Sequence, residues 1–247
     1  MFKNWAQTDI GKVRADNEDA YWCGGEQDWF LALVADGMGG HQAGEVASEM
    51  AVDIIRRIIQ ANLVGSDITI DEAKDMLCQS VHVANNQIFH QAQRHRSLSG
   101  MGTTVTAVLF FNGMAQIAHV GDSRAYLLRE GVLRQLTKDH SLVQELLDSG
   151  SIAPEEARYH PKRHLLTRVL GTAPDLNIDD INLEIKPLDL VLLCTDGLTG
   201  ELSDSEIKDV LTFLPPDQVP AELVRRALDR GGRDNVTVAL VQAGEEL

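Results

Sequence analysis

Acidic residues stand at the borders of several short apolar runs in this chain. Asp36 and Asp196 each close an apolar run and are followed by glycine, and Asp122 closes a third run with the glycine before it. The acids placed at such borders are Glu18, Asp19, Asp36, Asp122, Asp196 and Asp234. If the runs are adjacent strands, the carboxylates converge at one end of a sheet, where they repel one another unless a cation lies among them. Oxygen ligands favour Mg²⁺, Ca²⁺ or Mn²⁺ over zinc.

Each of these acids also has an ordinary structural explanation. Asp-Gly after a strand is a common turn, and an Asp before a strand is a common turn or cap residue. The residues alone therefore leave two interpretations open, a metal site and a set of independent turns.

Other chemistries fit the sequence poorly. In the glycine-rich stretch 37–44, Gln42 breaks the dinucleotide fingerprint, and directly after it Glu45 stands where a phosphate loop has its lysine. A cysteine-nucleophile phosphatase needs an arginine six residues after its cysteine, and those positions hold Trp29, Ala84 and Gly200. The pair His160 and His164 is interrupted by Pro161 and has no glutamate after the first histidine, so it is not a zinc protease motif.

Composition narrows the choice of partners. The 247 residues include 22 Lys+Arg and 37 Asp+Glu, a formal net charge of −15. Such a surface repels nucleic acid and anionic lipid, so neither is expected as a partner. Cys23, Cys78 and Cys194 lie far apart and form no Cys-x-x-Cys pair, so we expect neither a zinc site nor disulfides. The N-terminal residues lack an apolar signal core and no run approaches a membrane span, so a cytoplasmic protein is expected.

The elements that must position the acids form a single domain, since no repeat or long linker interrupts the chain. We expect strands at 20–22, 29–35, 103–111, 114–120, 124–129, 178–185, 189–195 and 235–242. We expect helices from about Gly44, at 71–94 with Asp71 as a possible cap, at 204–214 and at 217–230. Asn112-Gly113 predicts a hairpin. Hairpins with grouped helices indicate an α+β layered fold rather than alternating parallel units. Residues 138–175, polar and containing three prolines, look like an insert over the sheet.

Seven motifs in order make a more specific pattern. They are Arg14-Ala15-Asp16-Asn17-Glu18-Asp19-Ala20, Val34-Ala35-Asp36-Gly37-Met38-Gly39-Gly40-His41, Gly100-Met101-Gly102-Thr103-Thr104, Gly121-Asp122-Ser123-Arg124, Asp139-His140-Ser141, Thr195-Asp196-Gly197-Leu198 and Arg233-Asp234-Asn235-Val236-Thr237. Together they resemble the motif series of the bacterial metal-dependent (PPM, type 2C) protein serine/threonine phosphatases, over Asp9 to Val241. The resemblance implies a four-layer α-β-β-α sandwich with two central antiparallel sheets. It also implies one catalytic domain over 1–247, with 138–175 as a flap.

The resemblance assigns metal-binding roles. The acid matching Asp36 bridges two Mn²⁺ or Mg²⁺ ions, the carbonyl matching Gly37 binds one of them, and the acids matching Asp196 and Asp234 complete the protein ligands. Hard octahedral cations keep several waters, and a water between two cations loses its proton readily. The implied reaction is in-line attack of that hydroxide on a phosphoserine or phosphothreonine ester.

Five further residues have implied roles. Glu18 and Asp19 match acids that act mainly through metal-bound water, and Arg14 matches the phosphate-binding arginine, whose fork of donors suits that anion. Asp122 matches the acid that, with Asp196, holds a third and weaker ion. His41 is a candidate general acid, although three residues separate it from Asp36-Gly37, and a simple role at the helix start is the alternative.

The resemblance implies phosphorylated protein substrates, the targets of serine/threonine kinases, and a monomer is expected. Two other function classes stay open. An inactive relative used as a binding module would normally have lost a metal acid, and none is missing here. A two-metal phosphodiesterase or nuclease would use the same water chemistry, but the charge of −15 argues against it.

Overall fold

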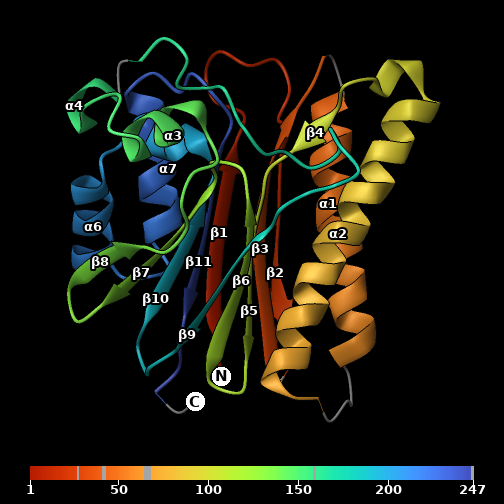
Figure 1. Ribbon diagram of the computed structural model, residues 1–247. Coiled ribbons are helices and arrows are strands. Elements are labelled where there is room, and N and C mark those ends of the chain that lie inside the picture. The colour runs from red at the N-terminus through yellow and green to blue at the C-terminus, as the bar shows by residue number, and fades with distance from the viewer. Residues whose placement is uncertain (27, 41–42, 64–67, 158–159, 246–247) are drawn as a thin grey trace.

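The computed structural model describes residues 1–26, 28–40, 43–63, 68–157 and 160–245. Two antiparallel sheets form its centre (Figure 1). The first sheet has the order β1 (Lys3–Asp9), β11 (Val236–Gln242), β10 (Leu190–Cys194), β7 (Arg124–Arg129), β8 (Val132–Gln135). The second sheet has the order β2 (Asp19–Gly25), β3 (Trp29–Met38), β5 (Val105–Phe111), β6 (Met114–Val120), β9 (Asp179–Glu184), and β4 (Gly102–Thr103) pairs with β3.

Helices cover the outer face of each sheet. α1 (Ala43–Leu63) and α2 (Ile70–Arg94) lie on the second sheet, and α6 (Asp204–Phe213) and α7 (Val219–Asp229) lie on the first (Figure 1). One apolar core fills the space between the sheets and two others lie beneath the helices. The expected α-β-β-α sandwich is confirmed.

The hydrophobic run of β3 follows from its place in the middle of these layers. Leu31 and Leu33 pack beneath the helices, whereas Ala32 and Val34 pack between the two sheets. Because both faces of the strand are buried, its sequence shows no polar–apolar alternation. The strand also continues two residues beyond Asp36, to Met38.

One sequence-based expectation needs correction, and two strands were missed. The N-cap of α2 is Thr69 rather than Asp71. The Thr69 hydroxyl accepts the Glu72 N–H, and the Thr69 N–H donates to the Glu72 carboxylate, which completes a capping box. The edge strands β1 and β8 were not predicted, because both are partly exposed and offer only a weak hydrophobic pattern, and β8 has only four residues. The hairpin at Asn112-Gly113 is confirmed, with φ of 48° and 74° at the two residues.

The segment between β8 and β9 contains little regular structure. It includes α3 (Leu142–Asp148) and the short α4 (Pro154–Ala157), which lie near one end of the sandwich (Figure 1). Isolated bridges join Thr103 to Leu170 and Ser141 to Leu166. A 3₁₀ turn, η1 (Arg96–Leu98), follows α2.

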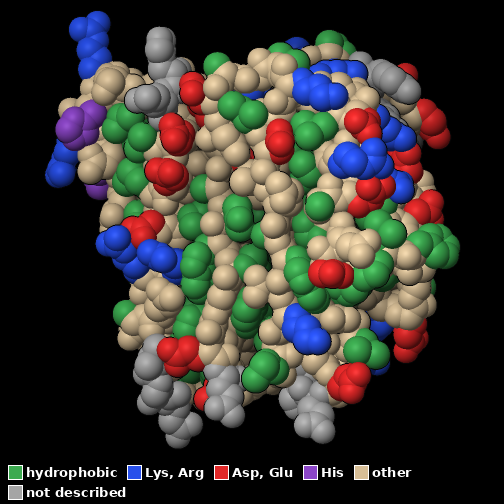
Figure 2. All heavy atoms as spheres, turned by 180° about the vertical axis from the view of Figure 1, so that it is seen from behind, with side chains coloured by type: hydrophobic (Ala, Val, Ile, Leu, Met, Phe, Trp, Pro, Cys, Tyr) green, Lys and Arg blue, Asp and Glu red, His purple; other side chains and the backbone are tan. Residues whose placement is uncertain are grey.

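The surface seen from behind carries mixed charge. Acidic and basic side chains alternate toward its margins, hydrophobic side chains lie toward its middle, and the described residues on that face form no continuous basic area (Figure 2). No helix within the described ranges is long and apolar enough to cross a membrane.

Candidate metal centre

Asp36 and Asp19 face each other on neighbouring strands. Asp19 is the register partner of Asp36 across the β2–β3 pair. The backbone at Asp36 is fixed from the other side, because its N–H donates to Thr104 Oγ1 at 2.9 Å and its carbonyl accepts the Thr104 N–H at 2.9 Å. The Thr103 hydroxyl donates to the same carbonyl at 2.9 Å. The backbone at Asp36 is therefore held by its pairing with β2 and by the hydroxyls and main chain of Thr103 and Thr104 at the β4–β5 junction.

The first sheet brings further acids to this end of the sandwich. Asp196 follows β10 and begins the short helix α5 (Asp196–Thr199), Asp234 comes two residues before β11, and Asp122 lies in the turn between β6 and β7. The Thr195 hydroxyl donates to Asp19 Oδ2 at 2.8 Å and so joins the two sheets. Sequence reasoning expected these acids to converge, and the geometry brings them together from both sheets.

The convergence has an electrostatic signature. Burial, followed by the charges of Asp19, Asp196, Asp122 and Asp234, raises the pKa of Asp36 well above its usual value. Burial raises the pKa of Asp19 to about 7, although the Thr195 and Thr237 hydroxyls lower it. A carboxyl group with so high a pKa is one whose ionised form lacks compensating positive charge.

Asp122 and Asp196 show the same effect. Burial and then the charge of Asp196 raise the pKa of Asp122 well above its usual value. Burial and then the charge of Asp234 raise the pKa of Asp196. A divalent cation would supply the missing charge, and its binding would favour the ionised forms of these groups.

A buried carboxylate oxygen without a partner fits the same explanation. Asp19 Oδ1 is buried and has no hydrogen-bond partner. Buried oxygens without partners are uncommon in folded proteins and often mark the place of an ion or water. Within the described part of the chain, no three Asp, Glu, His or Cys side chains already lie in positions from which they could hold a metal ion together. The donor set nevertheless fits a hard cation, since it is made of carboxylate and carbonyl oxygens.

Gly37 lies where the backbone of two other segments approaches closely. A Cβ atom at this position would meet Gly44 O at 2.1 Å and Glu18 O at 2.6 Å, so only glycine fits. The Gly37 N–H donates to Glu18 O at 3.0 Å. The Glu18 carboxylate accepts a backbone hydrogen bond from Gly44 at the start of α1, and burial raises its pKa. Glu18 therefore caps a helix as well as bordering the acidic cluster.

Arg14 places a positive charge beside the cluster. Its guanidinium donates to Asp234 Oδ2 at 2.7 Å and lies 3.7 Å from Glu18 Oε2. Burial opposes the charged form, but the Asp234 bond raises the pKa of Arg14. The loop that carries Arg14 is tied down by Asn235, whose amide donates to Ile10 O at 2.9 Å and Asp16 O at 3.0 Å and accepts the Glu18 N–H at 2.8 Å.

Asn235 had no role in the sequence interpretation, although it lies inside a quoted motif. Its polarity at the first position of the expected apolar strand 235–242 is the signal that could have pointed to it. His41 lies outside the described residues, so its candidate role as a general acid stays a prediction.

A cavity of about 460 Å³ opens beside two of the acids. Asp122 and Asp196 line it together with Arg163 and His164 from the 138–175 segment. His164 lies close enough for its charge to lower the pKa of Asp196. Sequence reasoning assigned no site role to Arg163 or His164, because nothing in their spacing predicts contact with residues so far along the chain.

Comparison with known proteins agrees with this geometry. The protein phosphatase 2C family profile matches residues 11–229. The serine/threonine phosphatase Stp of Listeria welshimeri is 39% identical over 241 residues, covering 96% of this chain and 94% of that protein. The crystal structure of Stp1 from Staphylococcus aureus matches with a TM-score of 0.92 at 37% identity, covering 98% of this chain and 95% of that one.

A further solved structure contains metal. The catalytic domain of the phosphatase PstP in complex with two manganese ions matches with a TM-score of 0.86 at 37% identity, covering 98% of this chain and 97% of that one. The matches in sequence and in structure each extend over most of the chain. The chain therefore belongs to the protein phosphatase 2C family and is a metal-dependent phosphatase of the bacterial PPM type.

Proposed function

We propose that this protein hydrolyses phosphoserine and phosphothreonine esters in phosphorylated proteins, with two Mn²⁺ or Mg²⁺ ions at the acidic cluster. The observation that carries the proposal is the convergence of five aspartates from both sheets, with one buried oxygen, Asp19 Oδ1, left without a partner. The names of the relatives and the two manganese ions of the PstP structure support the same substrate class and cofactor.

The motif resemblance and the placement of the acids support one set of ligands. Asp36, the Gly37 carbonyl, Asp196 and Asp234 would hold the two ions, with Asp36 shared by both, and Asp19 and Glu18 would act through water. Asp122 with Asp196 would hold a third, weaker ion beside the cavity that both acids line. When bound, the ions supply Lewis acidity and an activated water for attack on phosphorus.

Arg14 pairs with Asp234 at the edge of the acidic cluster. Its planar fork of donors also suits a phosphate group, so Arg14 would hold the substrate phosphate once a cation neutralises Asp234. The guanidinium therefore orients the ester and offsets its charge, and His41 is the candidate donor of a proton to the leaving oxygen.

The rest of the domain defines access to the site. We assign 1–247 to one catalytic domain in which 138–175 is the flap, and we place the protein substrate against the cavity that the flap borders. The targets of serine/threonine kinases are the proposed substrates, and a cytoplasmic monomer is the proposed form.

The test compares three substrates with Mn²⁺ and with EDTA. We expect turnover of p-nitrophenyl phosphate and of a phosphothreonine peptide with Mn²⁺, no turnover in EDTA, and none of bis-p-nitrophenyl phosphate. Preferred cleavage of the diester would replace this proposal with a phosphodiesterase. Binding of the phosphopeptide without any hydrolysis would indicate an inactive binding module.

A further inference from the structure

The turn that carries Asp122 is held on both sides by two consecutive residues, Asp139 and His140. Before Asp122, the Gly121 N–H donates to His140 Nδ1 at 3.1 Å, and the Gly121 carbonyl accepts the His140 N–H at 2.7 Å. After Asp122, Arg124 donates to both carboxylate oxygens of Asp139, at 2.8 and 2.7 Å. We call Asp139 and His140 the clasp.

The two ring nitrogens of His140 have different partners. Nδ1 accepts the Gly121 N–H, which places the proton of the neutral ring on Nε2. Nε2 lies 3.2 Å from Asp179 Oδ2 and 3.1 Å from Arg168 Nη1, which itself donates to Asp179. Burial lowers the pKa of His140, in agreement with a neutral ring. The ring also stacks against His119 at a centroid distance of 4.8 Å. His140 therefore connects Gly121 to β9 through one nitrogen on each side.

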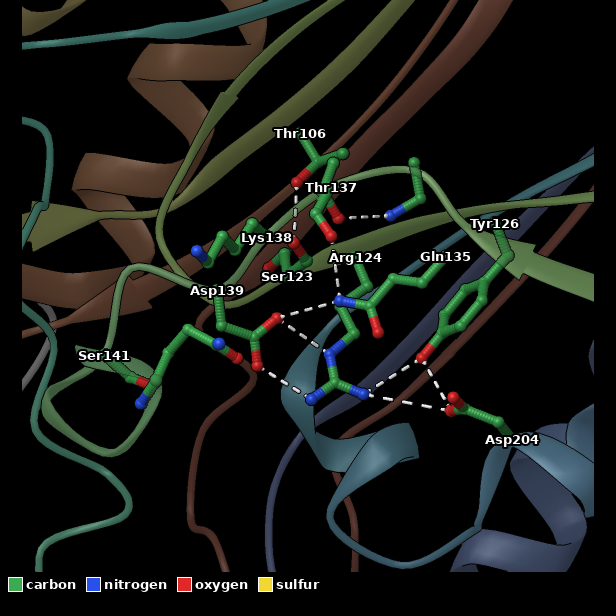
Figure 3. Close-up of polar contacts among 12 residues, drawn as sticks. Thr106, Ser123, Arg124, Tyr126, Gln135, Thr137, Lys138, Asp139, Ser141 and Asp204 are labelled. Atoms are coloured by element: carbon green, nitrogen blue, oxygen red, sulfur yellow. Dashed lines mark hydrogen bonds and ion pairs between the residues drawn. The ribbon is translucent and has the colours of Figure 1, made fainter. Parts of the chain in front are cut away.

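The Arg124–Asp139 pair continues into a larger polar network (Figure 3). The Arg124 guanidinium also donates to the Tyr126 hydroxyl at 3.0 Å, and that hydroxyl donates to Asp204 at 3.0 Å. Asp204 begins α6. The network therefore locks the far side of the Asp122 turn to the helical layer, and a bidentate pair of this kind is geometrically specific.

The clasp is also the start of the flap. The Thr167 N–H donates to the His140 carbonyl at 2.9 Å, and the Leu142 N–H donates to the Leu165 carbonyl at 2.8 Å. Arg168, near the other end of the flap, pairs with Asp179 at 2.7 Å, the same carboxylate that faces His140. Both ends of the flap thus meet at the residues that hold the Asp122 turn.

We infer that Asp139 and His140 are positioning residues that fix the Asp122 carboxylate for the third cation and couple that cation to the docked flap. The inference rests on the proposed role of Asp122. Since the clasp belongs to both the flap and the Asp122 turn, a cation at Asp122 and the docked flap stabilise each other, and this coupling is reciprocal.

Two substitutions at His140 separate its two bonds. His140→Asn places an amide oxygen near the position of Nδ1 and keeps the acceptor for Gly121, but it loses the donor to Asp179. His140→Gln reaches the position of Nε2 and keeps the donor to Asp179, but it loses the acceptor for Gly121. In Mn²⁺ titration calorimetry, we expect His140→Gln to weaken the third site about tenfold and His140→Asn to change it less than about twofold. Both should leave the two tight sites unchanged.

Asp139→Asn is the second arm, in case a His140 variant does not fold, and it too should weaken the third site severalfold. Asp189→Asn is the matched control. Asp189 accepts a bidentate bond from Arg129 in the same sheet, at 2.8 and 2.5 Å, but it has no contact with the Asp122 turn among the contacts of the described residues. Its substitution should lower the melting temperature without changing the third site. If Asp139→Asn resembles Asp189→Asn in the titration, or if the two His140 variants are equally affected, the clasp is only structural.

Hydrogen exchange tests the coupling between the cation and the flap without a measurement of catalytic activity. Raising Mn²⁺ through the range of the third site should slow amide exchange over 138–150 in wild type and leave it unchanged in Asp122→Ala. If both proteins respond alike, the coupling does not exist. If wild type binds Mn²⁺ at two tight sites but at no third site, and turns over fully, the clasp does not position a metal ligand. The proposal of a two-metal phosphatase would be unaffected by that result. A wild type that binds no Mn²⁺ would overturn both.

Discussion

The hydroxyl of Thr195 donates a 2.8 Å hydrogen bond to Asp19 Oδ2, which joins the end of β10 in one sheet to the start of β2 in the other. The Thr195 hydroxyl oxygen also accepts the Thr237 N–H at 3.0 Å. An apolar core fills most of the space between the two sheets. At the acidic end they meet through this buried contact, which leaves Asp19 Oδ1 free for another partner.

Thr195→Val tests this contact. Valine has nearly the same shape but removes the donor to Asp19 and the acceptor for Thr237, so we expect the free energy of unfolding to fall by about 1–3 kcal/mol. Mn²⁺ affinity should also fall, because Asp19 loses its orientation. Calorimetry measures both effects. Thr172→Val, which removes a hydroxyl bonded to Val169 O at 3.0 Å, is the control and should leave Mn²⁺ binding unchanged.

Asp36→Asn tests the bridging role. The amide keeps the shape of the side chain but lacks the charge that holds both cations, so kcat with p-nitrophenyl phosphate should fall at least about a hundredfold at saturating Mn²⁺. Asp196→Asn and Asp234→Asn should behave similarly. Rates close to wild type in Asp36→Asn would be incompatible with a two-metal centre.

Arg14→Ala separates binding from chemistry. Loss of a charged hydrogen bond to phosphate should cost about 1.5–3 kcal/mol, seen mainly as a higher KM and weaker inhibition by inorganic phosphate. Arg14→Lys should recover part of this loss, since a lysine keeps the charge but not the fork of donors. Arg57→Ala removes an exposed arginine paired with Asp53 and is the control. An unchanged KM in Arg14→Ala would show that Arg14 only neutralises Asp234.

The sequence predicted those parts of the fold that strong local patterns encode. The fully buried run of β3, the hairpin at Asn112-Gly113 and the long helices have clear periodicity or turn chemistry. The edge strand β1 has no such local pattern, because its residues are partly exposed. Its pairing partner, β11, lies more than two hundred residues further along the chain. Register between such distant segments leaves no local signal.

The residues of the candidate site fall into the same two groups, those with a local sequence signal and those without one. The acids could be proposed because each stands at the border of an apolar run, where local pattern and chemistry coincide. The contact between Thr195 and Asp19, the loop anchored by Asn235 and the flap residues beside Asp196 depend on three-dimensional packing. Single positions with such roles look like ordinary polar residues in the sequence.

The last prediction concerns the dependence of stability on pH. In the metal-free protein the folded-state pKa values of Asp19, Asp36, Asp122 and Asp196 are raised, that of Asp19 to about 7 from an ordinary 3.8. Between about pH 4 and about pH 7, the folded state therefore binds more protons at these carboxyl groups than the unfolded state does. The contribution of these groups is consequently most favourable below pH 4 and is lost as the pH rises from about 4 to about 7.

Four melting curves at each of two pH values, 5 and 7.5, test this prediction: wild type and Asp36→Asn, each with EDTA and with Mn²⁺. In EDTA, wild type should lose more stability between the two pH values than Asp36→Asn, which lacks one repelling charge and should melt at the same temperature or higher at pH 7.5. Mn²⁺ at about 100 times Kd should stabilise wild type by about 2.7 kcal/mol per site, more at the higher pH, because the ligands must be ionised. The mutant should gain much less. Aspartates that only form turns predict no response to Mn²⁺ and a small loss of stability on substitution. A wild-type melting temperature that Mn²⁺ does not move at pH 7.5 would therefore rule out a metal site formed by these acids.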